Sequence, residues 1–178
     1  MKKIIFLLLL ICCYGCSDSS TDVNEGSAQQ KFNSIKGTYA GSIMVDNIPQ
    51  KISIAVGNDL SVRYLPLRPI LSRIFSGAAL DEAEESAGLM TFTLPLDQMM
   101  IADGSIYLTL EPTDLVFTVE VAGKSCVVSA LLEGTAFAPK NTDNLTLSMD
   151  VTALNSDGIA YDLKDNSINY FVDNAKKE

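Results

Sequence analysis

Histidine and tryptophan are both absent from the 178 residues of this chain. Without histidine, neither a Ser-His-Asp nor a Cys-His catalytic arrangement can be assembled, and metal sites lose their commonest ligand. Walker loops, Gly-x-Gly-x-x-Gly and Ser-x-x-Lys are missing as well. These absences remove the usual routes to nucleophilic and nucleotide-dependent catalysis. We therefore expect a protein that is not an enzyme and that uses no cofactor and no metal ion.

Cysteine is scarce outside the first residues. Three of the four cysteines are Cys12, Cys13 and Cys16, and only Cys126 lies in the remainder of the chain. A single cysteine cannot form an internal disulfide bond, so the fold must depend on its apolar core. Cys126 alternates in phase with Val128 and Ala130, which indicates a buried thiol that packs as a small apolar group.

Basic residues are also few. Thirteen lysines and arginines face 22 acidic residues, and the formal net charge is −9. An acidic surface repels nucleic acid and anionic lipid head groups. We therefore expect no nucleic-acid partner, and attachment to a membrane would require acyl chains rather than a basic patch.

The N-terminus has the layout of a secretory signal peptide. A basic start precedes an apolar run over 4–11, which is too short to span a bilayer as a stable helix. The following Gly15-Cys16 resembles the end of a bacterial lipoprotein signal. That resemblance implies cleavage before Cys16, lipidation of Cys16 and attachment to the membrane through its acyl chains. Ser17 favours the outer membrane by the same resemblance, and the sequence leaves open whether the domain faces the periplasm or the outside.

Behind the signal, residues 17–30 are polar and contain almost no apolar side chains. Such a composition favours a flexible tether because it cannot bury enough surface to fold. The predicted organisation is a signal peptide at 1–15, a lipidated cysteine and tether at 16–31, a β domain at 32–174 and a frayed tail at 175–178.

From position 39 onward, apolar residues alternate with polar ones, as is typical of strands with one buried face. In the third such stretch, Leu60, Val62 and Tyr64 share the inner face. Connectors such as Asp46-Asn47-Ile48-Pro49 and Asp103-Gly104 are turn-prone and short enough to join antiparallel neighbours only. We therefore predict an all-β fold, a single antiparallel meander of eight to nine strands that closes into a barrel and so removes its edges. The predicted strands lie at 39–45, 52–56, 60–64, 90–96, 106–110, 115–121, 126–132, 145–153 and 159–163.

One segment interrupts this pattern after the third strand. Its apolar residues have helical spacing, and Pro69 suits a first helical turn. We predict one short helix at about 67–76 that either plugs the barrel end or forms a movable lid over a ligand, and the plug is favoured. The acidic run 81–85 that follows is interpreted as a solvated surface. The apolar stripe consists of Leu67, Ile70, Leu71, Ile74 and Phe75.

All three arginines of the chain fall in the same region. One hypothesis is that they receive an anionic head group at the mouth of the barrel, because a guanidinium suits such a partner. The other, which we favour, is that they pair with the acidic run just downstream. The candidate ligand site comprises Arg63, Arg68, Arg73, Ile70, Ile74 and Phe75.

The start of the first strand carries the pattern Gly37-x-Tyr39-x-Gly41. This pattern resembles the opening of many lipocalin-like domains, in which the aromatic position usually holds tryptophan. Together with the lipid cysteine and the short tether, it is similar to Bacteroides-type lipoproteins with a lipocalin-like (calycin-like) β-barrel. The resemblance implies an eight-stranded barrel that can hold an apolar molecule, and it implies no catalytic residues.

Two functions remain open from the sequence. A lipid-anchored protein could bind a small apolar ligand inside a hollow barrel. Alternatively, a filled barrel could act as a structural or protein-interaction module of the envelope. An eight-stranded barrel is just wide enough for either arrangement.

Overall fold

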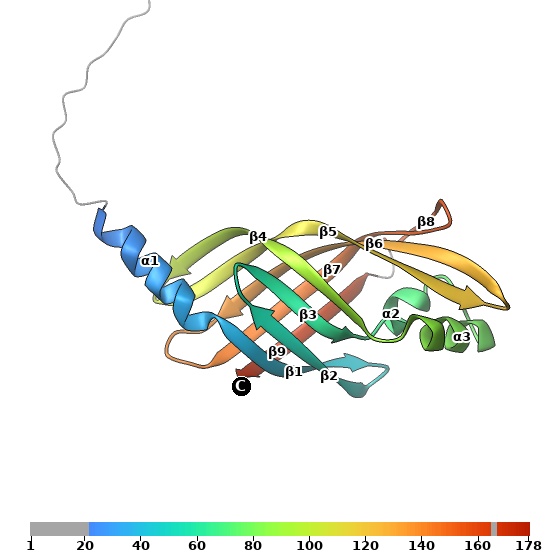
Figure 1. Ribbon diagram of the computed structural model, residues 1–178, viewed down its shortest axis with the longest axis horizontal. Helices are drawn as coiled ribbons and strands as arrows, with labels where there is room; N and C mark the ends of the chain where they lie inside the picture. Colours follow the sequence, from blue (N-terminus) through green and yellow to red (C-terminus); the bar gives the residue numbers. More distant parts are fainter. Residues whose placement is uncertain (1–21, 165–166) are drawn as a thin grey trace, which may run out of the picture.

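The computed structural model describes residues 22–164 and 167–178 (Figure 1). The expected signal peptide, the lipidation of Cys16 and the first part of the tether lie outside the described residues. Three helices and nine strands are described, namely α1 (Asp22–Ile35), β1 (Gly37–Val45), β2 (Ile48–Val56), β3 (Asp59–Leu65), α2 (Arg68–Leu71), α3 (Ala78–Ala87), β4 (Met90–Ala102), β5 (Ser105–Val121), β6 (Lys124–Ala138), β7 (Asn144–Ser156), β8 (Ile159–Tyr161) and β9 (Ile168–Lys177).

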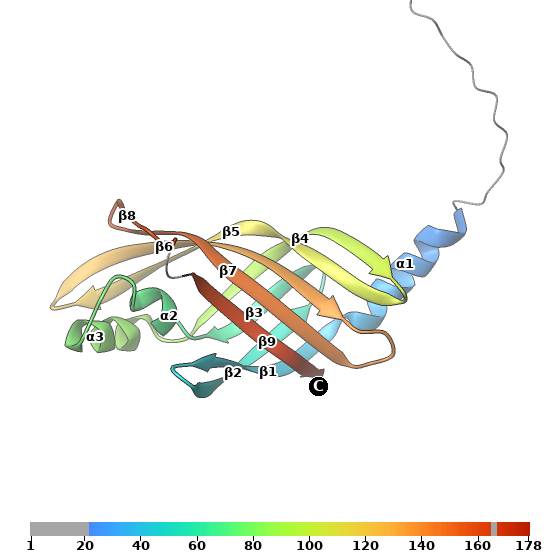
Figure 2. The ribbon, with the colours of Figure 1, turned by 180° about the vertical axis from the view of Figure 1, so that it is seen from behind.

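The strands form a closed antiparallel meander. Neighbours along the chain pair from β1 through β7, and β9 pairs with both β7 and β1 to close the ring (Figure 2). β8 and β9 pair with different parts of β7, on the edge opposite β6. Together, β8 and β9 therefore occupy the position of the eighth strand of the barrel. The predicted all-β, lipocalin-like barrel is confirmed.

Two strand predictions were wrong. The stretches 106–110 and 115–121 belong to the single strand β5, in which Pro112 is accommodated where the register shifts between Leu110 and Thr113. The last strand, β9, was not predicted, and the tail at 175–178 is not frayed. Ala175 is buried, and the Lys177 N–H donates to the carbonyl of Asp143.

The third strand ends in a bulge that changes which side chains face inward. The register shifts between Arg63 and Leu65, and Tyr64 has a positive φ of 66°. Tyr64 is consequently exposed and Leu65 is buried, so the predicted inward position of Tyr64 was wrong. The bulge directs the chain from β3 into Pro66 and the start of α2.

The interior of the barrel is filled by its own side chains. Buried apolar residues from all strands except β8 form one contiguous cluster. The largest fully buried members include Tyr39, Tyr170, Ile54, Leu60 and Leu108. An eight-stranded barrel has room for such side chains and little more.

The glycines of the Gly37-x-Tyr39-x-Gly41 pattern fit the start and the closing seam of the barrel. Gly37 opens β1 with a positive φ of 144°. A Cβ at Gly41 would lie 2.6 Å from Cγ1 of Val172 and 3.0 Å from Cβ of Ala175, both on β9. The missing side chain therefore allows β9 to pass close to β1 at the point of closure.

The N-terminal part of the described chain is helical rather than an irregular tether. α1 covers Asp22–Ile35, and the polar side chains at 27–34 are mostly exposed. Within residues 26–35, the buried side chains are those of Phe32 and Ile35. The Tyr39 hydroxyl donates to the carbonyl of Ile35 at 2.6 Å, and Lys177 Nζ donates to that of Ser34 at 2.8 Å. These donors satisfy carbonyls that the end of a helix leaves unpaired.

The short helix predicted after the third strand is confirmed, in a shorter form than expected. α2 is a single turn with Pro69 near its start, and the acidic run forms a second helix, α3, that was not predicted. Leu67, Ile70 and Leu71 are at most 1% exposed and belong to the core. In the part of the chain that the structure describes, no helix is long and apolar enough to cross a membrane.

Candidate functional site

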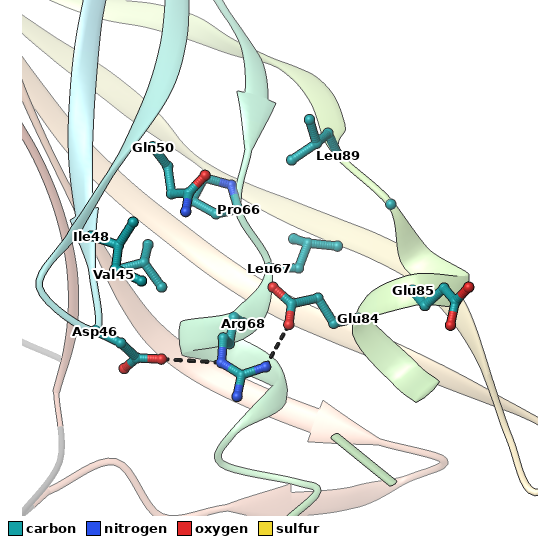
Figure 3. A pocket seen from close by; sticks show the side chains of 11 residues that line it. Val45, Asp46, Ile48, Gln50, Pro66, Leu67, Arg68, Glu84, Glu85 and Leu89 are labelled. Atoms are coloured by element: carbon teal, nitrogen blue, oxygen red, sulfur yellow. Dashed lines mark hydrogen bonds and ion pairs between the residues drawn. The ribbon is translucent and has the colours of Figure 1, made fainter. Parts of the chain in front are cut away.

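The strongest candidate site is a groove at the end of the barrel that carries α2 and α3 (Figure 3). Three segments that are distant in sequence line it: the β1–β2 hairpin, the start of α2 and the end of α3. Its volume is about 470 Å³, which falls within the range of ligand-binding clefts. The lining residues are Val45, Asp46, Ile48, Gln50, Pro66, Leu67, Arg68, Glu84, Glu85, Gly88 and Leu89.

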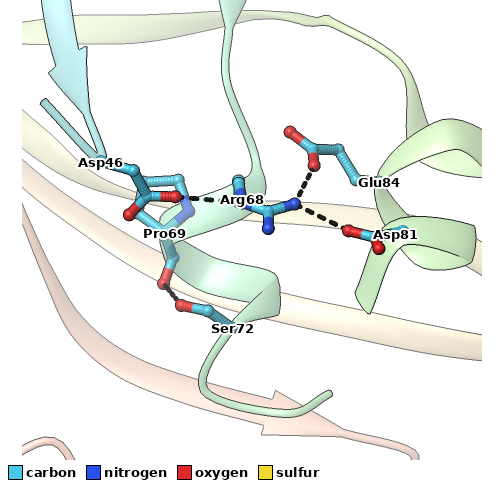
Figure 4. A network of polar contacts seen from close by, with 6 residues as sticks. All are labelled: Asp46, Arg68, Pro69, Ser72, Asp81 and Glu84. Carbon is cyan, nitrogen blue, oxygen red and sulfur yellow. Dashed lines mark hydrogen bonds and ion pairs between the residues drawn. The ribbon is translucent and has the colours of Figure 1, made fainter. Parts of the chain in front are cut away.

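Arg68 joins the three segments through ion pairs (Figure 4). Its Nε donates to Oδ2 of Asp46 at 3.0 Å, and its Nη1 donates to Oδ1 of Asp81 at 3.1 Å. The same Nη1 also donates to Oε2 of Glu84. These bonds to Glu84, Asp81 and Asp46, in that order of influence, raise the pKa of Arg68 above its usual value. The guanidinium therefore serves as a fixed positive centre surrounded by carboxylates.

Local sequence explains why these partners reach Arg68. Asp46 and Asn47 both have positive φ, which fits the tight two-residue turn that joins Val45 to Ile48. Asp46 is therefore held at the tip of the β1–β2 hairpin. Asp81 and Glu84 are three residues apart on α3, so they project from the same face of that helix.

The acidic run is largely exposed, as its interpretation as a solvated surface predicted, and its carboxylates are also divided among several contacts. Asp81 and Glu84 bind Arg68, whereas Glu82 accepts a hydrogen bond from the Ala122 N–H on the β5–β6 hairpin at 2.8 Å. Ser86 accepts a second bond from this hairpin at 2.8 Å. Glu85 lines the groove. α3 is thus fixed between Arg68 and the projecting hairpin.

The structure separates the three arginines that the sequence grouped. Arg68 pairs with carboxylates of the acidic run, as the favoured hypothesis predicted, and also with Asp46, which was not predicted. Within residues 22–164 and 167–178, neither Arg63 nor Arg73 forms an ion pair. Arg63 is exposed on β3, and Arg73 follows α2 and lines a different surface pocket; neither lines the groove. They do not form one anion clamp.

The apolar residues proposed for ligand binding are core residues in the structure. Ile70 is fully buried, and Ile74 and Phe75 are half-buried against the same core cluster. None of them lines the groove. Their positions fit a plug at the barrel end and give no surface for a ligand.

Cys126 lies outside this site. Its side chain is half-buried, with Sγ 2.9 Å from Oγ of Ser156. Burial is the main cause that raises the pKa of the Cys126 thiol, which disfavours the reactive thiolate. The nearby Asp157 has a lowered pKa, chiefly because it accepts the Val127 N–H at 2.8 Å and also because it bonds Cys126.

Sequence reasoning missed most of the groove. Ile48 and Leu89 are large apolar residues that remain 58% and 64% exposed on its rim. Asp46 was assigned only to a turn. Asp46 is 22 positions from Arg68 in the sequence. Their ion pair could not be predicted without the fold, which places the β1–β2 hairpin beside α2.

The groove offers both apolar and charged groups to a binding partner. Apolar rims flank carboxylates and one guanidinium, and no pair of groups has the arrangement of a nucleophile and its base. Among the described residues, no three His, Cys, Asp or Glu side chains lie close enough together to hold a metal ion. Comparisons with protein-family models, curated proteins and solved structures found no match for this chain.

Proposed function

We propose that this protein is a non-catalytic lipoprotein of the outer membrane, anchored through acyl chains on Cys16, whose filled barrel acts as a rigid interaction module. The alternative of an apolar carrier requires internal space for a ligand. The observation that supports the module is the occupied interior, in which Ile54 and Leu60 are fully buried and Leu108 is 2% exposed. α2 also plugs one end of the barrel with the buried side chains of Ile70 and Leu71.

The anchor is tested by fractionation of cells that process bacterial lipoproteins. The wild-type protein should sediment with the outer membrane, incorporate radiolabelled palmitate and resist a salt wash. Cys16→Ala should lose the label and become soluble, because the acyl chains supply most of the membrane affinity. Cys126→Ala, which removes a thiol from the folded domain, is the matched control and should behave as wild type. Cys16→Ala protein that still sediments after the salt wash would contradict the anchor.

The filled barrel is tested by native mass spectrometry of the purified protein. A module should give the mass of the acylated chain alone, both before and after gentle activation in the gas phase. An apolar molecule that copurifies reproducibly with the Cys16→Ala protein, and that is released only on unfolding, would favour the carrier instead. The variant is used because it carries no acyl chains that could retain lipid.

A further inference from the structure

We propose that the groove beside Arg68 binds a segment of a partner protein in which basic side chains alternate with apolar ones. This inference rests on the proposed function, because it names the surface that an interaction module would present. It depends on three properties of the groove: its exposed apolar rims, its excess of carboxylates and its position in the molecule.

The rims are apolar and exposed on two different elements. Ile48, at the start of β2, is 58% exposed, and Leu89, between α3 and β4, is 64% exposed. Between them, Pro66 and Leu67 contribute to the lining (Figure 3). Large apolar side chains on both sides of a concave surface are typical of sites that desolvate on binding a partner.

The charge of the groove selects a cationic partner. Asp46, Glu84 and Glu85 line it, and Asp81 stands beside it, against the single cation Arg68. Four carboxylates and one guanidinium leave an excess of negative charge. An acidic segment would be repelled, and a lysine or arginine of a partner would be attracted.

The groove is also preformed. The ion pairs of Arg68 fix the β1–β2 hairpin against α3, and the α3 contacts to β5 fix that helix in turn. A surface that is rigid before binding loses little conformational entropy when a partner docks. Figure 1 places this end of the barrel opposite α1. A partner could therefore reach the groove from the side that faces away from α1.

The test uses the purified full chain and fluorescein-labelled, capped heptapeptides as probes. The main probe is Gly-Leu-Lys-Leu-Lys-Leu-Gly, which alternates apolar and basic residues. One comparison peptide replaces both lysines by glutamate, and another replaces the three leucines by serine. Fluorescence anisotropy should show saturable binding of the main probe and much weaker binding of both comparison peptides.

Variants of the groove locate the binding. Leu89→Ser and Ile48→Ser should each weaken binding of the main probe about tenfold, as expected for apolar anchors at an interface. Glu85→Gln should weaken it about threefold, as expected for an exposed charge pair. The matched controls are Phe171→Ser, an exposed apolar residue on β9, and Asp97→Asn, an exposed carboxylate on β4, neither of which lines the groove. Both should bind as wild type, and circular dichroism should confirm that every variant is folded.

Three results would overturn the proposal. The first is no saturable binding of the main probe at about 1 mM, the weak limit for a specific contact. The second is unchanged binding by folded Leu89→Ser and Ile48→Ser protein. The third is displacement of the probe by octylammonium at equal concentration, which would indicate a site for small amphipathic cations. Each result leaves the anchor and the filled barrel standing, because those are measured without a peptide.

Discussion

The two ends of this barrel are both covered by a helix, but the helices differ in how much they bury. α1 has 14 residues, and within residues 26–35, whose burial is described, it buries Phe32 and Ile35. α2 has four residues and buries Ile70 and Leu71 completely. The shorter helix therefore belongs to the core and the longer one lies on its surface. The stabilising effect of a helix depends here on the apolar face it buries rather than on its length.

The ends also resemble each other in one detail. At each end, a buried tyrosine hydroxyl donates to a backbone carbonyl of the segment that covers the barrel. Tyr39 bonds the carbonyl of Ile35 at the end of α1, and Tyr170 bonds the carbonyl of Pro66 just before α2. The two interactions allow the ends to be compared with matched substitutions.

Leu71→Ala should have the largest effect. Leu71 is fully buried in the plug, and its truncation should lower the free energy of unfolding by about 3 kcal/mol through lost burial and a residual cavity. Urea denaturation measures this change. Ser72→Ala, on the exposed side of the same turn, is the control. A loss below about 1 kcal/mol for Leu71→Ala would mean that the plug is not part of the cooperative core.

Phe32→Ala tests the opposite end. Phe32 is the larger of the two buried side chains described in α1, it is 9% exposed, and the ammonium of Lys36 lies 5.0 Å from the centre of its ring. We expect a loss of about 2 kcal/mol, less than for a fully buried phenylalanine, because the site at the surface can relax. Lys36→Met isolates the contribution of the cation. If Phe32→Ala equals or exceeds Leu71→Ala, the contrast between the two ends is wrong.

Much of the barrel could be predicted from the sequence because alternation and short turns act locally. The alternation of Leu145, Leu147 and Met149 identified β7, and the Asp46-Asn47 turn was correctly placed between two strands. Prediction failed where the pattern is interrupted. Three consecutive apolar residues at 170–172 obscured β9, and the bulge after Arg63 inverted the positions of Tyr64 and Leu65.

Helix α1 and the groove could not be predicted for different reasons. α1 has no apolar stripe and contains Gly26, so neither periodicity nor propensity indicates a helix. Contacts at its last residues hold it to the barrel, and these depend on the position of Lys177, which is 143 residues from Ser34. The groove likewise depends on tertiary placement, since Asp46, Arg68 and Glu84 meet only in the closed barrel.

We expect the two buried tyrosines to make the stability of the fold depend on pH in the same direction. Burial raises the pKa of Tyr170 above its usual value, and burial together with the nearby Asp143 raises that of Tyr39. A raised tyrosine pKa means that the neutral hydroxyl stabilises the fold. This contribution to stability is complete at pH values below the tyrosine pKa in the unfolded state, which is about 10. It is lost as the pH rises from that value toward the higher pKa of the folded state.

Tyr170→Phe should cost about 1.5 kcal/mol at neutral pH, because it leaves the Pro66 carbonyl without its donor. Tyr39→Phe should cost about 1 kcal/mol, since the carbonyl of Ile35 lies at a helix end. Thermal unfolding between pH 7 and 11 measures both effects. The double variant should lose most of the alkaline decline in stability, and an unchanged decline would show that other groups cause it.

The smallest effect is expected for Gln29→Ala on the exposed face of α1. Gln29 donates to Oδ1 of Asn33 at 3.2 Å, an i,i+4 pair that contributes about 0.3 kcal/mol. Alanine has a higher helix propensity than glutamine, and this gain in stability offsets the loss of the pair. Urea denaturation should therefore show a change within about 0.5 kcal/mol of zero, as should Ser72→Ala at the other end. If both exposed substitutions change stability equally little, the difference in stability between the two ends must come from their buried side chains. A loss above about 1 kcal/mol for Gln29→Ala would instead mean that the polar face of α1 packs against another surface in solution.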